Sequence, residues 1–321
     1  IVVTWDDMDQ LSQLIPLLAR VYPHGEADVN RFAAAGGPAF VFGELIRAGL
    51  MHGDIVTVAR GGMADYAREP RLQDGQVTWV DGIVRSADET VARGVDNPFE
   101  SQGGLRLLRG NLGRSLIKLS AVKPQYRSIE APAVVVDAPQ VLNKLHAAGL
   151  LPQDFVAVVR YQGPRANGMP ELHSLAPLLG LLQNQGRRVA LVTDGRLSGA
   201  SGKIPAAIHM TPEAARGGPL GKLREGDIIR LDGEAGTLDV LVDAAEWAAR
   251  EHAPNTAPAA NDLGRNLFAV NRQVVGPADQ GAISISCGPA ASDGSAWDYD
   301  AEYELGHDAA AAAAPHEAKD A

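Results

Sequence analysis

"LVTDGRLSGASGKIPAAIHMTPEA", residues 191–214, is the stretch that decides how this chain is organised. It begins as a β-branched apolar strand, continues into a loop rich in Gly, Ser and Lys, and ends at an apparent helix start. Small residues let backbone N–H groups approach a ligand, so we expect a ligand-binding loop at a strand end, with a plain tight turn as the alternative. The loop gathers an acid, a base, two serines and a lysine: Asp194, Arg196, Ser198, Ser201 and Lys203.

Three familiar types of site do not fit this loop. A phosphate-binding P-loop requires a glycine and a Ser or Thr at the positions that Leu197 and Ile204 occupy. Ser198 lies in GRLSGAS rather than in the G-x-S-x-G turn of a serine hydrolase. None of the eight histidines has the HExxH or HxH spacing of a zinc hydrolase.

A second polar stretch, VVRYQGPRANGMPELHSL at residues 158–175, also follows an apolar strand. We expect Glu171 to open a helix there, where a carboxylate either complements the helix dipole, worth about 0.3–1 kcal/mol, or binds a hard cation such as Mg²⁺. The residues leave both roles open. His173, in the same turn, is better explained as a surface or packed histidine than as a ligand.

The second half of the chain has the pattern of a β-rich domain. Short apolar or β-branched runs separated by Gly, Pro and Asp predict strands from residue 103 onward, with helices at 138–148, 171–186 and 213–216. A strand, turn, strand pattern at 223–243 is not expected of an alternating parallel sheet. We therefore predict a barrel or sandwich flanked by helices.

The first half has a mixed α and β pattern. Apolar residues at helical spacing predict a proline-interrupted helix at 5–22, another at 27–34, and a Gly-Pro-initiated helix followed by a strand within 36–59. Charged and turn residues dominate 62–102, which indicates a surface connection.

These patterns predict two domains, at 1–95 and 103–285, joined by a linker at 96–102. The Ala-rich, acidic segment at 286–321 lacks core-forming residues, so we expect a disordered tail. Because the sequence opens on Ile1 in what resembles a strand end, we expect it to be part of a longer protein.

The composition excludes several classes of protein. The chain has 321 residues, 45% of them apolar, and a net charge of −10, which argues against an electrostatic nucleic-acid surface. A single cysteine, Cys287, excludes an intrachain disulfide and any zinc or cluster site built from thiolates of this chain alone. No apolar run approaches the roughly 18 residues of a membrane span, so we expect a cytoplasmic protein.

Several stretches together carry a resemblance to a known family. NGMPELH at 167–173, the loop at 191–214 and GGPLGKLREGDIIRLD at 217–232 resemble the C-terminal half of the dihydroxy-acid and sugar-acid dehydratases. AAGGPAFVFGELIRAGLMHGDIVTVA at 34–59 and GGLRLLRGNLGRSLIKLSAV at 103–122 match the same family in the same order. Several long motifs in register make this resemblance specific.

Within the family, TDGRLSGASGK and GPRANGMPELH are similar to the phosphogluconate branch. The branched-chain dihydroxy-acid dehydratases typically have a phenylalanine before the serine and lack the ASGK continuation. The resemblance therefore implies a hydro-lyase that dehydrates 6-phospho-D-gluconate to 2-keto-3-deoxy-6-phosphogluconate in the Entner–Doudoroff pathway. Another sugar acid or a branched-chain 2,3-dihydroxy acid is the alternative substrate, and a catalytically silent anion-binding module is the alternative function.

The resemblance also implies an α/β fold and cofactors. It implies a swivelling β/β/α domain, similar to a β-barrel, preceded by the end of an α/β N-terminal dehydratase domain. In the family, the remaining N-terminal half carries the cysteines of an iron–sulfur cluster, here expected to be 4Fe-4S, and most ligands of Mg²⁺. No cluster ligand is assigned in this chain, and Cys287 lies outside the family motifs. We expect a homodimer of the complete enzyme, no nucleic-acid or membrane partner, and no activity from this chain alone.

Residue by residue, the resemblance assigns roles to the two polar loops. Ser198 matches the family serine proposed as the base at C2, and Glu171 matches a magnesium-binding glutamate. Asp194 and Arg196 flank the serine and either orient the loop or bind substrate, the planar guanidinium of Arg196 being suited to a carboxylate or phosphate. Anion binding is also assigned to two further cations, Arg165 and Lys203.

Overall fold

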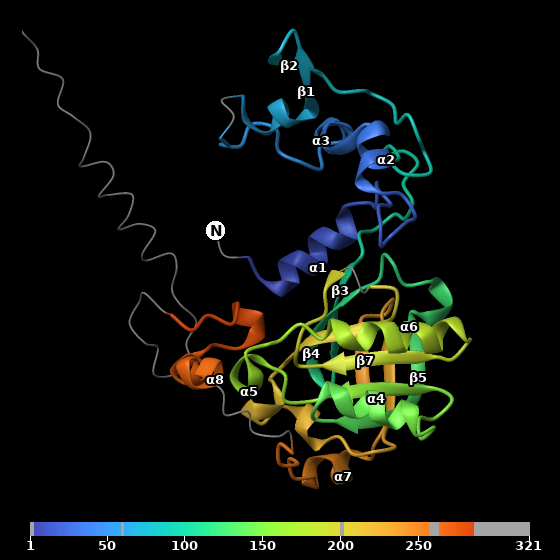
Figure 1. Cartoon of the computed structure of the whole chain (residues 1–321), viewed down its shortest axis with the longest axis vertical. Coiled ribbons are helices and arrows are strands. Elements are labelled where there is room, and N and C mark those ends of the chain that lie inside the picture. The colour runs from blue at the N-terminus through green and yellow to red at the C-terminus, as the bar shows by residue number, and fades with distance from the viewer. Residues whose placement is uncertain (1–2, 59–60, 200–201, 257–262, 286–321) are drawn as a thin grey trace, which may run out of the picture.

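A closed β-barrel forms the larger part of the protein (Figure 1). The computed structural model describes residues 3–58, 61–199, 202–256 and 263–285. Within them the barrel strands run in the order β10-β3-β4-β8-β7-β6-β5-β9. Their bounds are β3 Leu105–Gly110, β4 Gly113–Lys118, β5 Ser128–Val136, β6 Phe155–Val159, β7 Val189–Thr193, β8 Ala206–Thr211, β9 Ile228–Asp232 and β10 Thr237–Val240.

Two strand arrangements meet in this barrel. Strands β5, β6, β7 and β8 pair in parallel, whereas β3 with β4 and β9 with β10 pair antiparallel. Antiparallel pairs β4–β8 and β5–β9 join the two halves, and one parallel contact between β10 and β3 closes the ring. Parallel neighbours need a crossover, and helices α4 (Pro139–Ala147) and α6 (Ala176–Asn184) lie on the crossovers and cover the parallel half (Figure 1).

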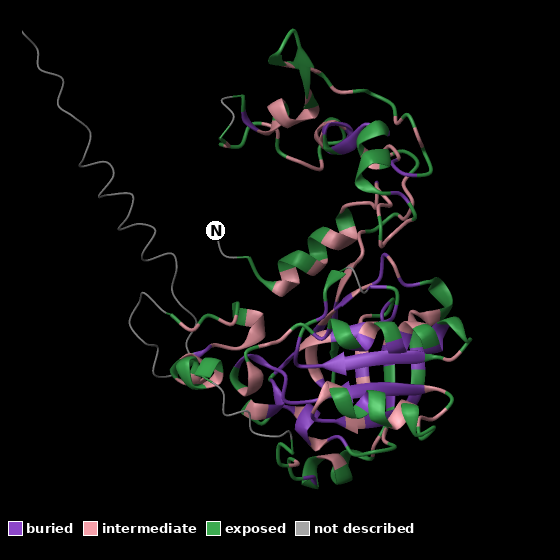
Figure 2. Ribbon diagram, in the orientation of Figure 1, coloured by how far each residue is buried: buried purple, intermediate pink, exposed green. Residues whose placement is uncertain are grey.

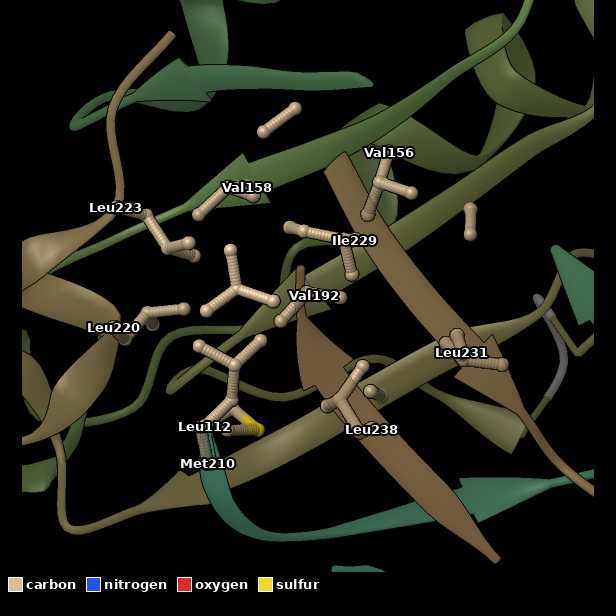
Figure 3. Packing of buried hydrophobic residues seen from close by; sticks show 14 of the residues in the cluster. Leu112, Val156, Val158, Val192, Met210, Leu220, Leu223, Ile229, Leu231 and Leu238 are labelled. Carbon is tan, nitrogen blue, oxygen red and sulfur yellow. The ribbon is translucent and has the colours of Figure 1, made fainter. Parts of the chain in front are cut away.

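The parallel strands are buried on both faces because both faces are covered. Every residue of β6 (FVAVV) and β7 (VALVT) is buried (Figure 2). Val156 and Val158 point into the barrel, where they pack in the interior cluster (Figure 3). Phe155, Ala157 and Val159, which alternate with them, pack outward in the cluster that includes the covering helices. Continuous apolar runs are the expected sequence of such two-sided strands.

Helix α1 (Trp5–Leu14) lies against the barrel strand β3. The Asp9 carboxylate accepts the backbone N–H of Leu107 at 2.8 Å, and the Ser12 hydroxyl accepts that of Leu105 at 3.0 Å. Side chains of the helix thereby accept hydrogen bonds from backbone N–H groups of β3 that would otherwise have to bond to water. The N-terminal residues are attached to the barrel by these contacts.

The remaining N-terminal residues form a smaller unit with its own core and a β-hairpin (Figure 1). Its elements are α2 Val29–Ala34, α3 Gly37–Arg47, the 3-10 helix η1 Gly62–Ala67, β1 Arg68–Gln73 and β2 Gln76–Asp81. Its buried cluster consists of Ala27, Ala35, Phe40, Val91 and Ala92. Short elements around and after the barrel are η2 Pro124–Tyr126, α5 Pro164–Asn167, η3 His173–Leu175, η5 Ala214–Arg216, η6 Pro219–Lys222, α7 Ala244–Ala249, α8 Leu263–Leu267, α9 Ala269–Val274 and η7 Ala278–Gln280.

The predicted α/β class with a barrel-like second part is confirmed, whereas four local predictions are wrong. The helix expected at 5–22 ends at Leu14, and beyond Pro16 residues 17, 19 and 21 form isolated β-bridges instead. Residues 62–81 form η1 and the β1–β2 hairpin rather than an irregular connection. Residues 54–58 form no strand, and the helix expected at 171–186 begins only at η3. Its predicted first residue, Glu171, instead forms a β-bridge with Arg196, which is incompatible with a helical backbone.

Other expectations stay predictions. The domain bounds 1–95, 96–102 and 103–285 remain as expected from the sequence, and the tail at 286–321 lies outside the described residues. Among the described residues, none of the helices is both long and apolar enough to cross a lipid bilayer.

We predict that Leu231→Ala lowers the free energy of unfolding by about 2–5 kcal/mol, because it opens a cavity in a close-packed interior. Leu231 is fully buried in the barrel cluster (Figure 3). The matched control is Leu150→Ala, at a leucine that is 68% exposed. Urea unfolding of both variants measures the difference, and equal midpoints would contradict the assignment of the barrel interior as the core.

Candidate active site

Two polar loops leave the same edge of the barrel. Strands β6 and β7 are parallel neighbours, and their last residues, Val159 and Thr193, are paired in register. The segments 160–172 and 194–204 therefore begin side by side at the carboxyl ends of these strands. This is the edge at which parallel α/β sheets bind their ligands.

The two loops are joined by hydrogen bonds around the predicted serine. The backbone N–H of Ser198 donates to Oε1 of Glu171 at 2.8 Å. Next to it, the N–H of Leu172 donates to the carbonyl of Arg196 at 3.0 Å, and Arg196 Nε donates to the carbonyl of Met169 at 2.8 Å. Glu171, Arg196 and Ser198 are exposed. The structure thus brings together the base and the metal ligand that the sequence predicts, although they come from different loops.

Asp194 holds the loop in place through buried hydrogen bonds. It is fully buried, and its two carboxylate oxygens accept the N–H groups of Gln162 at 2.8 Å and Ala214 at 3.0 Å. Burial raises the pKa of Asp194 to about 6, against the lowering effect of these N–H groups. Of the two roles expected for Asp194, burial and these two hydrogen bonds favour orienting the loop.

Glu213 is a second buried carboxylate that the sequence did not single out. It is 2% exposed and accepts the N–H groups of Arg165 at 2.9 Å and Ala166 at 3.1 Å. A Cβ at Gly163 would lie 2.2 Å from Oε2 of Glu213, so only glycine fits this approach. Glu213 therefore fixes the start of α5 and leaves the Arg165 side chain exposed. The acid follows Pro212 just after β8, and no sequence signal marks it as buried.

Lys203 connects the loop to the N-terminal segment. Its carbonyl accepts Nε2 of Gln183 at 2.9 Å, which fixes the backbone. Its exposed Nζ lies 5.4 Å from the centre of the Tyr22 ring, within the range of a cation–π contact. Ser201, in the same loop, lies outside the described residues.

Lys118, which the sequence did not single out, lies beside the loop, and His24 lies near Lys118. A Cβ placed on Gly199 would be 2.9 Å from Nζ of Lys118. His24 Nδ1 is 2.7 Å from the hydroxyl of Ser120, and burial together with the charge of Lys118 lowers the pKa of His24. The one sequence feature that could have indicated Lys118 is its position at the end of an apolar strand, in SLIKLSAV.

His209 lies close enough to Arg196 for the two charges to interact. The backbone N–H of His209 donates to the carbonyl of Gly195 at 2.8 Å, and the centre of its ring is 6.3 Å from that of Trp5. Burial and the nearby Arg196 charge lower the pKa of His209. The imidazole is therefore neutral at neutral pH and adds no positive charge at the loop.

The side chains of the site fit one of the two implied cofactors in part and the other not at all. The described residues contain no cluster of three or more His, Cys, Asp or Glu side chains that could hold a metal ion. Oε1 of Glu171 is held by Ser198, and no described donor pairs with Oε2, so Glu171 offers one free oxygen to a hard cation. The single cysteine, Cys287, lies outside the described residues, and one thiolate does not fit an iron–sulfur cluster.

Comparison with known families gives the class of this fold and site. The C-terminal domain model of the dihydroxy-acid/6-phosphogluconate dehydratases matches residues 90–282. The N-terminal domain model of the same family matches residues 1–66. The chain belongs to the dihydroxy-acid/6-phosphogluconate dehydratase family.

Individual relatives point to one branch of it. The chain is 53% identical to the phosphogluconate dehydratase of Pseudomonas aeruginosa and 50% identical to that of Escherichia coli K12, with 88% of this chain and 47% of each relative aligned. It is 32% identical to the dihydroxy-acid dehydratase of Sulfurisphaera tokodaii, over 88% of this chain and 48% of that protein. The chain spans about half the length of the curated relatives it matches.

We predict that Glu171→Gln keeps the loop in place, because an amide carbonyl can still accept the N–H of Ser198, whereas Glu171→Ala loosens it. Hydrogen exchange of the Ser198 amide measures this directly. We expect protection close to that of the unchanged protein in the glutamine variant and a loss of about five- to tenfold or more in the alanine variant, equivalent to roughly 1 kcal/mol for a lost hydrogen bond. Equal protection in all three proteins would contradict the contact.

A second prediction concerns pH. The pKa of Asp194 is about 6 in the folded protein and ordinarily 3.8, so the folded state binds more protons between these values. Stability contributed by Asp194 is therefore fully present below about pH 4 and is lost as pH rises through 6, on the order of 3 kcal/mol.

Asp194→Asn removes this titration at nearly constant size. We expect the free energy of unfolding of the unchanged protein, minus that of Asp194→Asn, to fall as pH rises from 4 to 7. Denaturant unfolding across that range measures it. A difference that grows with pH would show that the two N–H groups outweigh burial.

Proposed function

We propose that this chain forms the Ser198 side of the active site of a 6-phosphogluconate dehydratase of the Entner–Doudoroff pathway. The observation that carries the proposal is the contact between Ser198 and Glu171 at the edge of the barrel, in a chain of this family. The higher identity to phosphogluconate dehydratases than to the dihydroxy-acid dehydratase of Sulfurisphaera tokodaii supports the substrate.

The reaction sets demands that these residues can meet. A proton must leave C2 of the sugar acid and hydroxide must leave C3, after which the enol tautomerises to the ketone. We assign the C2 proton to the oxygen of Ser198. Because a serine hydroxyl is a weak base, it needs strong electrostatic activation. The positive charge of Arg196, two residues earlier in the loop, acts in that direction.

The substrate would be oriented by cations of the two loops. Arg196, Lys203 and Arg165 are exposed, and no described carboxylate is paired with the side chain of any of them. Charge-assisted hydrogen bonds to carboxylate and phosphate are strong and directional. These residues stay predicted substrate ligands, with Asp194 holding the loop that carries two of them.

Cofactors and partners complete the proposal. An iron–sulfur cluster and Mg²⁺, when bound, would supply Lewis acidity at the leaving hydroxyl and at the carboxylate end of the substrate. Glu171 would contribute one ligand to Mg²⁺, and the cluster would require thiolates from outside this chain. We further expect a homodimer of the complete enzyme and a cytoplasmic location.

A catalytically silent anion-binding module is the second candidate. The single cysteine of the chain favours it, because no cluster can form from this chain's thiolates. The joint presence of Ser198 and Glu171 favours the dehydratase, because anion binding alone needs neither a base nor a metal ligand.

The test is anaerobic dehydration of 6-phosphogluconate by this chain joined to the N-terminal half of the Pseudomonas aeruginosa relative, with reconstituted cluster and Mg²⁺. We predict that Ser198→Ala lowers kcat by about 10²–10⁴-fold, the contribution of a positioned acid or base. The matched control is Ser128→Ala, an exposed serine at the amino end of β5, which should retain full activity.

Each outcome separates the candidates. Activity that is lost in Ser198→Ala and kept in Ser128→Ala supports the dehydratase and the base together. A folded, cluster-loaded hybrid that dehydrates neither 6-phosphogluconate nor gluconate nor a branched-chain dihydroxy acid overturns the proposal in favour of the silent module. Turnover of one of the other acids alone would correct the substrate.

A further inference from the structure

Lys118 directs its charge at the backbone of the Ser198 loop. It is the last residue of β4, partly buried, and its Nζ would lie 2.9 Å from a Cβ on Gly199. Its Cδ would lie 3.8 Å from a Cβ on Gly202. The Gly202 N–H donates to the carbonyl of Gly199 at 3.3 Å. The absence of a side chain on Gly199 lets the ammonium approach the loop backbone this closely.

The charge of Lys118 has no counter-ion in the part of the chain that the structure describes. Neither a carboxylate nor any hydrogen-bond acceptor there is paired with its Nζ. Its neighbours are the loop backbone and the His24–Ser120 pair, in which the His24 pKa is lowered, so the imidazole is neutral near pH 7. Burial likewise lowers the pKa of Lys118. A partly desolvated ammonium without a partner is unfavourable for folding alone.

We propose that Lys118 binds an oxyanion of the substrate, its carboxylate or its phosphate, beside Gly199 of the Ser198 loop. The inference rests on the proposed function for the identity of the sugar acid, and it adds a ligand from a different strand. Because Lys118 approaches Gly199, the residue after Ser198, an anion bound there lies next to the predicted base. Lys118 is thus a substrate-positioning residue that no motif of the loop contains.

The test is direct binding, measured by calorimetry on this chain with 6-phosphogluconate, gluconate and inorganic phosphate as probes. Lys118→Met keeps the aliphatic stem and removes the charge, and Lys118→Arg keeps the charge. The matched control is Lys144→Met, at an exposed lysine on α4. We expect 6-phosphogluconate to bind about tenfold or more weakly to Lys118→Met, equivalent to roughly 1.4 kcal/mol, with partial recovery in Lys118→Arg and no change in the control.

The probes distinguish the two anionic groups. Weakening of 6-phosphogluconate and gluconate alike assigns Lys118 to the carboxylate, whereas weakening of 6-phosphogluconate and phosphate alone assigns it to the phosphate. Equal dissociation constants for the unchanged protein and Lys118→Met overturn the proposal, as does failure of the unchanged protein to bind any probe. Binding that depends on Lys118 without dehydration by the hybrid enzyme would refute the proposed function only.

Thermal unfolding distinguishes this role from a structural one. If Lys118 stabilised the fold, its replacement would lower the melting temperature. Removing an unpaired, partly buried ammonium that serves only ligand binding should not destabilise the ligand-free fold. We therefore expect ligand-free Lys118→Met to have the same melting temperature as the unchanged protein or a higher one. We also expect 6-phosphogluconate to raise the melting temperature of the unchanged protein more than that of Lys118→Met. A lower melting temperature for ligand-free Lys118→Met together with unchanged binding would make Lys118 structural.

Discussion

The parallel pairing of β6 with β7 is the constraint on which the candidate site depends. Both strands are buried on two faces, between the barrel interior and the covering helices. A slip of one residue would exchange the inward and outward side chains of a strand, which such packing does not tolerate. The register of Val159 with Thr193 is therefore fixed, and so are the points at which the two polar loops leave the barrel.

Two buried carboxylates hold the loops at this edge of the barrel in place. Asp194 ties its own loop to Gln162 and Ala214, and Glu213 ties the next turn to the start of α5. Each acid is surrounded by backbone N–H donors, which offset part of the free energy required to bury it. These buried acids support the loops that carry the exposed Ser198 and Glu171, and one oxygen of Glu171 accepts no hydrogen bond from a described donor.

The sequence predicts the barrel well because its signals are local. Long apolar runs separated by Gly, Pro and Asp predict the strands, and the meander at 223–243 appears as the β9–β10 pair. The start of the helix after Glu171 could not be predicted, because it depends on a bridge to Arg196 in another loop. The ligand loop was predicted from its small residues, whereas the contact between its serine and Glu171 was accessible only through the family resemblance.

Burial of single polar residues is the part that sequence does not determine. Asp194 and Arg196 are both charged residues of the same short loop, and nothing in the sequence separates their environments. In the structure Asp194 is fully buried and Arg196 is exposed. The difference arises from Gln162 and Ala214, which lie 32 and 20 residues away in the chain. Lys118 was overlooked for the same reason, since its proximity to Gly199 depends on how the barrel closes.

The arrangement of charge at this edge follows from how its cations are satisfied. Arg196 pairs with a carbonyl and Lys203 contacts an aromatic ring, whereas Lys118, close to Gly199, has no partner among the described residues. Neutral partners stabilise a cation without cancelling its charge, in contrast to the carboxylates that pair with arginines elsewhere, as Asp227 does with Arg250. A chain with a net charge of −10 therefore presents a locally positive surface at the Ser198 loop. The sugar acid of the proposed function is an anion, which such a local field would attract despite the negative net charge of the chain.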